Sequence, residues 1–394
     1  MEKVKRKKCE SWFYRPLWHI AKLFGAFYVS KNKMVFHPYE GKIEEPAIIL
    51  GNHGSFFDWY YMISCLNGVF PHFVMSRYYL TDHWYAKFLR AGGVVGKSVF
   101  ASDSQSAISL VRILKQGKSI ALFPEARLSA SHKAELIPPD TAAFVKRLGL
   151  PVYAVISEGA TFMMPKWHSK TKGARVETHV EKLFEGKELD SLSLEEVQVI
   201  IDKALYFDDF KYLEQHPEVE VETDAVGAEK VLIWCPKCHK EYTIKTHDKT
   251  LTCSSCGFEV KMDGRFHYTP STLVKNEGEW FEKQRLFYRD QVLANPNYSL
   301  ESKVKIRYLK DYVGEGVCKL DRTGFSFKGT EKGENLEFKF PLSEFFIFPF
   351  KAGDNFVIFV GKRCYIFCPE NSNETIKFNI ISDILQKEIR GLLT

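Results

Sequence analysis

The chain has 394 residues, of which 45% are hydrophobic and 26% are charged, and its formal net charge is +6. This length exceeds what one ordinary hydrophobic core accommodates, so we expect two or three domains. The composition is that of a folded, water-soluble protein, which excludes a largely disordered chain.

The first 30 residues combine basic and aromatic side chains. Cations between positions 3 and 8 precede an apolar, aromatic-rich segment at 12–27. This combination suits an anionic membrane surface, where cations meet the headgroups and rings lie just beneath them. A core helix with a solvated basic tail is the alternative. Polar residues such as Arg15 and Lys22 interrupt the segment, so we predict a membrane-interface helix over 1–30 and neither a spanning helix nor a secretory signal.

Residues 31–215 are predicted to form an α/β domain. Short apolar runs alternate with helical patterns, which indicates a mostly parallel sheet with flanking helices. The predicted strands are 47–50, 73–75, 93–95, 119–123 and 152–156, and the clearest helices are 107–116 and 142–147. A further helix begins at Ser193, where Glu196 completes a capping-box pattern. Functional residues are expected at the carboxyl ends of the strands.

The rest of the chain is predicted to hold smaller modules. An acidic linker at 216–230 leads to a cysteine-containing module at 231–268, a connecting helical segment at 269–302 and a β domain at 303–394. Seven short strands and a closing helix at 380–393 predict an antiparallel β-barrel or sandwich for the last module. The expected strands are 305–309, 316–320, 325–328, 336–340, 345–350, 355–360 and 363–368.

The first candidate site follows the first strand of the α/β domain, where His53 precedes Asp58 by five residues. Histidine is the side chain whose pKa suits proton abstraction from a hydroxyl near neutral pH. Gly54 permits a strand–turn–helix corner between the two residues. Across this corner, Asp58 is expected to accept a hydrogen bond from Nδ1–H of His53, which fixes the tautomer so that Nε2 faces the acceptor hydroxyl. The alternative is a histidine satisfied in a turn beside a helix-capping aspartate.

The second candidate site directly follows the strand at 119–123, in the segment Phe123, Pro124, Glu125, Ala126 and Arg127. An arginine at a strand's carboxyl end can hold a phosphate bidentately, and Glu125 can orient it or contact acceptor hydroxyls. A surface ion pair on a loop is the alternative.

Together these segments resemble the glycerolipid acyltransferases that include the 1-acylglycerol-3-phosphate acyltransferases. Asn52, His53 and Asp58 match the first motif, the segment at 123–127 matches the third, and residues 150–155 loosely match the apolar fourth. The resemblance covers about residues 10–215. It implies that His53 is the general base, that Asp58 orients it, and that Asn52, Phe123, Pro124, Glu125 and Arg127 bind substrate.

The same resemblance implies an acyl-CoA or acyl-ACP donor and a lysophospholipid acceptor, lysophosphatidic acid first. Two departures stand out. Ala126 replaces the usual glycine, so a left-handed backbone is not expected there, and Lys97 is the only candidate for the missing phosphate-binding arginine of the second motif. A lysophospholipid with a larger headgroup therefore stays open as acceptor.

Four of the nine cysteines form a candidate metal site. Cys235, Cys238, Cys253 and Cys256 have the spacing C-x2-C-x14-C-x2-C, which is typical of two knuckles around a tetrahedral thiolate site. Four sulfur ligands leave no open position, so a structural zinc is predicted, with iron or free thiols as alternatives. The module resembles a zinc ribbon. Its mixed charge and lack of stacked aromatics make nucleic acid an unexpected partner.

The β domain at 303–394 resembles PH or GRAM-type folds, which implies binding to a lipid surface or a protein. With no export signal and metal-type cysteine spacing, we predict a cytoplasmic protein attached peripherally to the inner face of the membrane. Two functions follow: an O-acyltransferase of phospholipid biosynthesis or remodelling, or a membrane-associated binding or scaffold protein with a degenerate acyltransferase fold.

Overall fold

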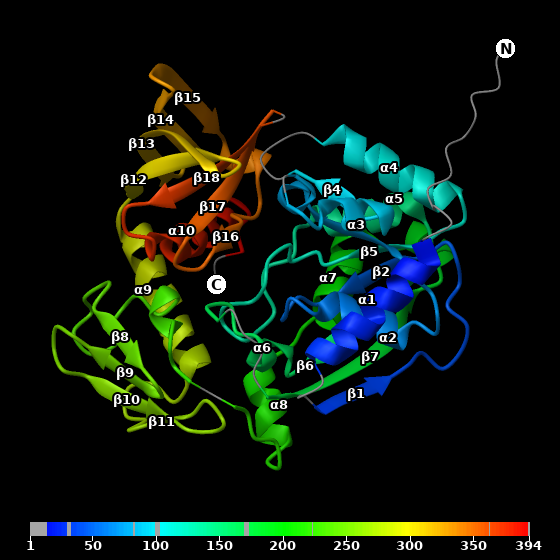
Figure 1. Cartoon of the computed structure of the whole chain (residues 1–394), viewed down its shortest axis with the longest axis horizontal. Helices are drawn as coiled ribbons and strands as arrows, with labels where there is room; N and C mark the ends of the chain where they lie inside the picture. The colour runs from blue at the N-terminus through cyan, green and yellow to red at the C-terminus, as the bar shows by residue number, and fades with distance from the viewer. Residues whose placement is uncertain are drawn as a thin grey trace.

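The computed structural model describes residues 14–29, 33–81, 83–98, 103–168, 173–222, 224–361 and 363–392. The predicted basic run at 3–8 lies outside these ranges. The described chain forms three sheets, with the first on one side of the molecule and the other two on the opposite side (Figure 1). Among the described helices, each is too short or too polar to cross a bilayer.

The first sheet has seven strands in the order β1-β7-β6-β2-β5-β3-β4, and all neighbours are parallel except β6 and β7. This confirms the predicted mostly parallel α/β class. Its strands are β1 (Lys33–His37), β2 (Ile48–Gly51), β3 (His72–Ser76), β4 (Val95–Lys97), β5 (Ile120–Leu122), β6 (Val152–Glu158) and β7 (Arg175–Phe184).

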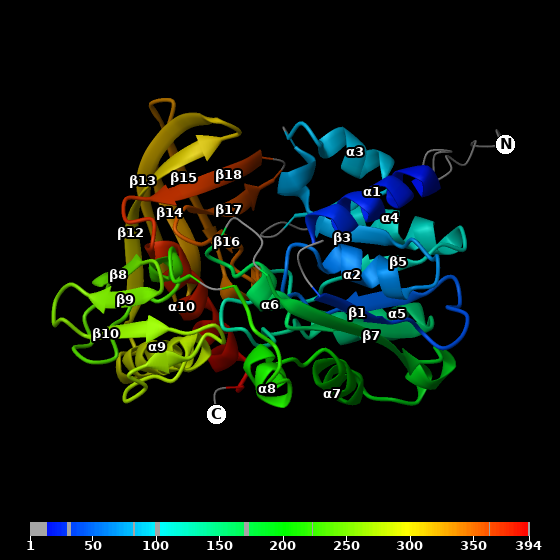
Figure 2. The same cartoon turned by 60° about the horizontal axis from the view of Figure 1, so that its bottom comes forward.

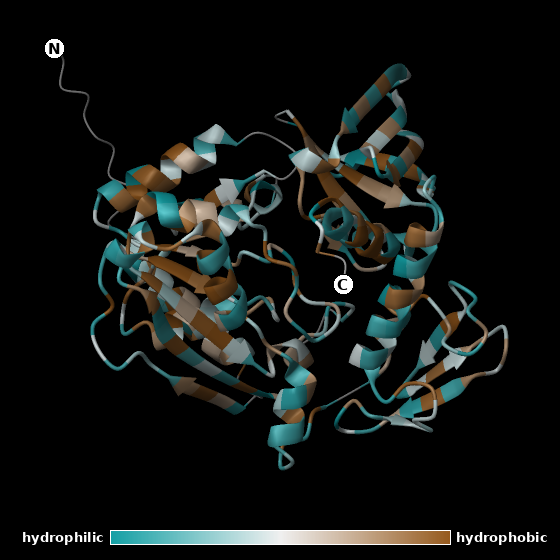
Figure 3. Cartoon of the chain, turned by 180° about the vertical axis from the view of Figure 1, so that it is seen from behind, coloured by the Kyte–Doolittle hydropathy of each residue, from teal (hydrophilic) through white to brown (hydrophobic). Residues whose placement is uncertain are grey.

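Alternate residues of the central strands enter different cores. Ile48 and Leu50 point into one hydrophobic cluster, and Ile49 between them points into another on the opposite face. Hydrophobic residues accordingly concentrate along the central strands (Figure 3). Helices α1 (Tyr14–Tyr28) and α2 (Asp58–Cys65) cover one face, and α4 (Ser104–Lys115), α5 (Asp140–Leu148) and α7 (Leu194–Ala204) cover the other. The sheet is therefore buried on both sides.

Several details differ from the sequence-based expectation. Strands β1 and β7 were not predicted, because both carry charged residues at an exposed side of the sheet. The strand expected at 93–95 runs over Val95–Lys97 instead. The capping box at Ser193 is confirmed, since the Ser193 hydroxyl accepts from the Glu196 N–H and the Glu196 carboxylate accepts from the Ser193 N–H.

The cysteine module is a small antiparallel sheet of β8 (Ile244–His247), β9 (Thr250–Cys253), β10 (Glu259–Met262) and β11 (Tyr268–Thr269). Helix α9 (Glu277–Ala294) follows it and runs toward the last sheet (Figure 1). The helix also packs along the small sheet, beside β10 in Figure 2, where Trp280 contacts Phe258 and Tyr268. The segment expected as an acidic linker packs more closely than a free linker would, because Val219, Val221, Ala225 and Ala228 are buried.

The C-terminal sheet is antiparallel, in the order β15-β14-β13-β12-β18-β17-β16, and helix α10 (Glu374–Ile389) packs against it. The antiparallel class and the closing helix are confirmed. The sheet is open, because β15 and β16 at its two ends do not pair with each other. The strands are β12 (Ser299–Tyr308), β13 (Asp311–Asp321), β14 (Gly324–Glu331), β15 (Glu334–Phe340), β16 (Phe350–Lys351), β17 (Asn355–Val360) and β18 (Arg363–Pro369).

Several C-terminal boundaries were wrong, and β12 and β13 begin six and five residues before the predicted positions 305 and 316. Only Phe350 of the strand expected at 345–350 is in a strand, because Phe345 and Phe348 bury their rings in the core as part of an irregular segment. Helix α10 begins six residues before the predicted position 380, because its first turns carry polar residues that hide the apolar periodicity.

One hydrophobic cluster runs through all three parts of the chain. It includes Phe57 and Phe162 from the first domain, Leu251 from the cysteine module, and Phe325 and Ile381 from the C-terminal domain. A cation–π contact adds to this interface, since the Lys166 ammonium lies 4.6 Å from the centre of the Phe350 ring. The C-terminal domain therefore packs directly against the α/β domain.

Candidate functional site

His53 lies on the corner between β2 and α2, at the carboxyl end of the central strand. Its Nδ1 is 2.8 Å from Oδ2 of Asp58, which occupies the first position of α2. Gly54 between them does not take a positive φ. The corner is closely packed there, because a Cβ on Gly54 would come within 3.1 Å of Thr161 Cγ2 and 3.3 Å of Ala160 Cβ, so a larger residue would require these side chains to shift.

The carboxylate of Asp58 is buried while the imidazole is partly open. The side chain of Asp58 is 2% exposed and that of His53 is 23% exposed. Burial raises the pKa of the Asp58 carboxyl, and hydrogen bonds from His53 and the Ser55 N–H act in the opposite direction. With Nδ1 facing Asp58, the His53 Nε2 makes no hydrogen bond to any described residue. The ring is thus oriented with one nitrogen held and the other available.

Glu125 fixes the backbone beside the imidazole and does not face it. Its Oε1 accepts from the His53 N–H at 3.0 Å, and its Oε2 accepts from the Glu135 N–H at 2.7 Å. The side chain is fully buried, and this burial raises its pKa to about 8. Glu125 therefore joins the corner at His53 to the loop after β5, which is a structural task and not the contact with acceptor hydroxyls expected from the sequence.

Two other expected substrate-binding residues also have structural partners. The amide of Asn52 donates to the Ser157 carbonyl and accepts from the Ser157 N–H, both at 2.8 Å, and so extends the pairing of β2 with β6. Phe123 stacks on the His53 ring, with centroids 4.6 Å apart and planes 16° from parallel. Pro124 is partly buried in the same loop. Phe123 is thus the member of this loop that touches the imidazole.

The expected phosphate-binding role of Arg127 does not agree with the structure. Its guanidinium donates to both carboxylate oxygens of Asp383, at 2.8 and 2.6 Å, and to Glu135 at 3.0 Å, with only 3% of the side chain exposed. Burial would raise the pKa of Glu135, but Arg285 and Arg127 more than offset it and lower it to about 2. Arg127 is engaged by carboxylates and has no face open to a phosphate.

Lys97 ends β4 and is exposed. Two strands lie between β4 and β2, so the lysine stands about 14 Å across the sheet from His53, given the usual spacing between neighbouring strands. It shares the carboxyl edge with His53 but does not contact it.

The carboxylates that hold Arg127 were not predicted from the sequence. Asp383 follows it by 256 positions and lies in α10. The only local signal is the presence of polar residues at buried positions of that helix, where Asn379, Asp383 and Gln386 lie among isoleucines and leucines.

Ala126 has φ +50°, so the expectation of an ordinary backbone at this position was wrong. A tight turn imposes this conformation, since the Ala126 N–H donates to the Phe123 carbonyl at 2.9 Å while the flanking Glu125 and Arg127 are both fixed by buried partners. The loop thus keeps the geometry that a glycine would adopt freely.

The four cysteines of the small module converge. One ligand atom from each of Cys235, Cys238, Cys253 and Cys256 lies within 4.8 Å of the others, and two of the sulfur pairs are 3.8 Å apart. A tetrahedral site with metal–sulfur bonds of about 2.3 Å separates its sulfurs by about 3.8 Å. These residues are therefore placed to hold a metal ion.

The two cysteine pairs have matching turns. The residue after each pair has a left-handed backbone, His239 at φ +60° and Gly257 at φ +68°. Each donates its N–H to the carbonyl of the first cysteine of its pair, at 2.9 and 3.0 Å. His239 is exposed and stacks on Trp234, so it does not take part in the cluster, and His247 is exposed as well.

Comparison with known proteins places the site in context. Residues 28–158 match the family model described as Acyltransferase. No curated protein matches the chain. Among solved structures, the 1-acyl-sn-glycerophosphate (LPA) acyltransferase PlsC from Thermotoga maritima is similar, with a TM-score of 0.43, 19% identity, and coverage of 52% of this chain and 81% of that one.

The left-handed turn predicts an unusual response to glycine. We expect Ala126→Gly to raise the free energy of unfolding by up to about 1 kcal/mol, because this backbone costs a residue with a Cβ about 1–2 kcal/mol and the freedom of unfolded glycine offsets part of the gain. Ala143→Gly, on the exposed side of α5, is the matched control and should lower it by about 1 kcal/mol. Chemical denaturation measures both, and equal losses would contradict the strained turn.

Proposed function

We propose that the chain moves a fatty acyl group from acyl-CoA or acyl-ACP to the free hydroxyl of a lysophospholipid, on the premise that residues 28–158 match the acyltransferase family model. Lysophosphatidic acid is the first candidate acceptor. The observation that carries the proposal is the His53 imidazole, held at Nδ1 by the buried Asp58 and open at Nε2.

The reaction follows from this geometry. Nε2 of His53 takes the proton of the acceptor hydroxyl as its oxygen attacks the thioester carbonyl, and Asp58 stabilises the imidazolium that forms. A carbon–oxygen bond forms, and the carbon–sulfur bond then breaks. The imidazolium returns its proton to the departing thiolate. No nucleophile from the protein is needed, because the lipid hydroxyl is the nucleophile.

A basic groove supports an acceptor with an anionic headgroup. It has a volume of about 410 Å³, lies beside β4 and the start of α4, and is lined by Arg77, Arg90 and Gly96 among others. Arg77 pairs with Asp103 at 2.9 Å, whereas the neighbouring Lys97 is exposed. Arg77 follows β3 and Lys97 ends β4, so both lie at the carboxyl edge of the sheet that also carries His53, which suits a phosphate held while the hydroxyl reaches the imidazole.

The exposed side of α1 supports attachment to a membrane surface. Leu23 is 72% exposed and Phe27 is 76% exposed, and Trp84 just before α3 (Ala86–Ala91) and Phe88 within it are exposed as well. The two regions adjoin, since the Trp18 indole donates to the Gly92 carbonyl at 3.2 Å. We propose that α1 lies in the headgroup region of the inner face of the membrane, where a lipid acceptor is found.

The sulfur cluster supports a structural zinc. Four thiolates fill a tetrahedral shell and leave no position for substrate, so the metal would fasten the two knuckles and take no part in acyl transfer.

The catalytic pair is tested by substitution. We expect His53→Ala to lower kcat by at least about 10³-fold and Asp58→Asn to lower it by about 10²–10⁴-fold, because base catalysis and its orientation are lost. His37→Ala is the matched control, since His37 also pairs with a carboxylate, Glu177 at 2.8 Å, but on the surface.

The assay uses purified protein, acyl-CoA or acyl-ACP, and a panel of lysophospholipids with monoacylglycerol as the acceptor that lacks phosphate. Activity that survives His53→Ala would refute the assigned base. A complete lack of transfer to every acceptor by the unmodified chain would favour the scaffold function instead.

Membrane attachment is tested by vesicle sedimentation. Leu23→Asp and Phe27→Asp should each weaken binding to anionic vesicles at least tenfold, because burying one large apolar side chain contributes about 1.5–3 kcal/mol. Val199→Asp on α7 is the control, since Val199 is 64% exposed on the other face of the sheet. Unchanged binding by both α1 variants would rule out this helix as the attachment site.

Metal content tests the cysteine cluster. Protein purified under reducing conditions should carry about one zinc per chain, and Cys253→Ser should lose the metal and melt at a lower temperature, because the metal fastens both knuckles. Cys368→Ser, outside the cluster, should retain it. Elemental analysis measures the metal content. If iron is found, the site is an iron site and not a zinc site, and if no metal is found, the four cysteines are free thiols.

A further inference from the structure

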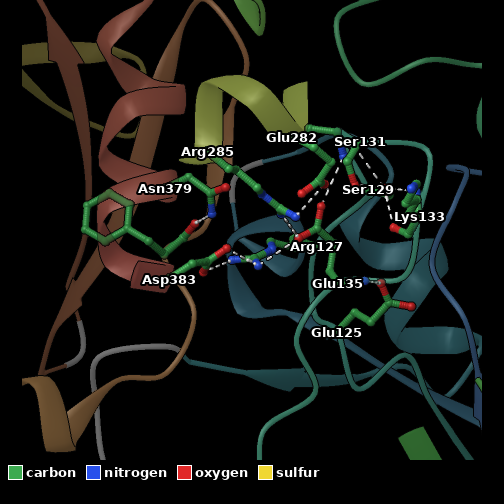
Figure 4. A network of polar contacts seen from close by, with 12 residues as sticks. Glu125, Arg127, Ser129, Ser131, Lys133, Glu135, Glu282, Arg285, Asn379 and Asp383 are labelled. Carbon is green, nitrogen blue, oxygen red and sulfur yellow. Dashed lines mark hydrogen bonds and ion pairs between the residues drawn. The ribbon is translucent and has the colours of Figure 1, made fainter. Parts of the chain in front are cut away.

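A polar network connects the imidazole corner to the C-terminal helix, and Figure 4 shows the part of it from Glu125 to Asp383. The His53 N–H donates to Glu125, the other oxygen of Glu125 accepts from the Glu135 N–H, and the Glu135 carboxylate accepts from Arg127. Arg127 ends the path with two parallel bonds to Asp383 of α10. Every step is a direct hydrogen bond of 3.0 Å or less.

The centre of the network is a buried group of opposite charges. Arg285 of α9, whose side chain is 22% exposed, donates to the same Glu135 oxygen at 2.7 Å and to Glu282 at 3.2 Å, so two guanidiniums face three carboxylates. The side chains of Arg127 and Glu135 are each 3% exposed and that of Asp383 is 10% exposed. Charges so placed depend on their partners, because removing one leaves the other buried and uncompensated.

Resting on the function proposed above, we propose that Asp383 is a positioning residue for acyl transfer. By fixing Arg127 it holds the loop after β5, and through Glu135 and Glu125 that loop holds the His53 backbone. The C-terminal domain thereby completes the active site of the α/β domain without contacting the reacting atoms. Arg127, which was expected to bind substrate, instead binds Asp383 of the C-terminal domain.

The same loop also carries Phe123, whose ring stacks on the imidazole. A shift of this loop therefore displaces both the backbone and the face of His53. Misplacement of a catalytic group by about 1 Å lowers rates by about 10²-fold even when substrate still binds.

The test compares two carboxylates of the same helix. Asp383→Asn removes the charge that reaches the α/β domain, and Glu388→Gln is the matched control, since Glu388 makes two 2.9 Å bonds to Arg322 within the C-terminal domain. We expect Asp383→Asn to lower kcat at least tenfold with KM changed less than threefold, and Asp383→Glu to recover part of kcat. Glu388→Gln should keep kcat within twofold.

Hydrogen–deuterium exchange provides a readout that needs no substrate. In the Asp383→Asn chain, peptides containing His53 and residues 123–135 should exchange at least tenfold faster, while the strands of the C-terminal sheet keep their protection. The same acceleration in the Glu388→Gln chain, or none in either, would overturn the proposal. So would a kcat for Asp383→Asn equal to that of Glu388→Gln.

Arg127→Lys covers the case in which Asp383→Asn does not fold. Lysine keeps the charge and loses the parallel pair of bonds, so a fall in kcat at constant KM with faster exchange at 123–135 supports the proposal, and unchanged kcat opposes it. If the unmodified chain transfers no acyl group, the proposed function fails, whereas the exchange comparison still shows whether α10 holds the loop.

Discussion

The Asp58 carboxylate at the first turn of α2 is the constraint on which the site depends. One of its oxygens accepts both the Ser55 N–H and the His53 Nδ1, so it closes the corner and orients the ring at once. Because the carboxylate is buried, water does not compete for these bonds, and the imidazole has one preferred direction. Residues around it, including Glu125 beneath and Phe123 beside the ring, preserve that direction.

Secondary-structure patterns and contacts between residues close in sequence could be predicted from the sequence. Apolar runs separated by helical periods predicted the parallel sheet, Ser193 and Glu196 predicted a helix start, and the spacing of the cysteines predicted their convergence. His53 and Asp58 also meet as expected, because five residues and one corner separate them. The helix start, the cysteine site and the His53–Asp58 pair each join residues that are close in sequence, so local geometry decides these contacts.

Long-range partners could not be predicted in the same way. Arg127 was expected to face a phosphate, yet its partner Asp383 lies 256 positions away, where nothing in the local pattern identifies it. The backbone of Ala126 could not be predicted for the same reason. Its left-handed conformation is imposed by Glu125 and Arg127, which are both held by buried partners, and not by the conformational preference of alanine. Asn52 and Glu125 occupy motif positions but hold the backbone, a distinction that only partners across the fold reveal.

One hydrophobic cluster joins the α/β domain, the cysteine module and the C-terminal sheet, so the domains are not expected to be stable when they are separated. Cutting the chain after the first domain would expose Phe162, which now contacts the Phe266 ring, and Phe210, which now packs beside Gly278. The fragment would be prone to aggregate, and the three modules should denature in a single transition. The three modules would then stay together in one chain even without a common reaction, because each one covers apolar surface of the others.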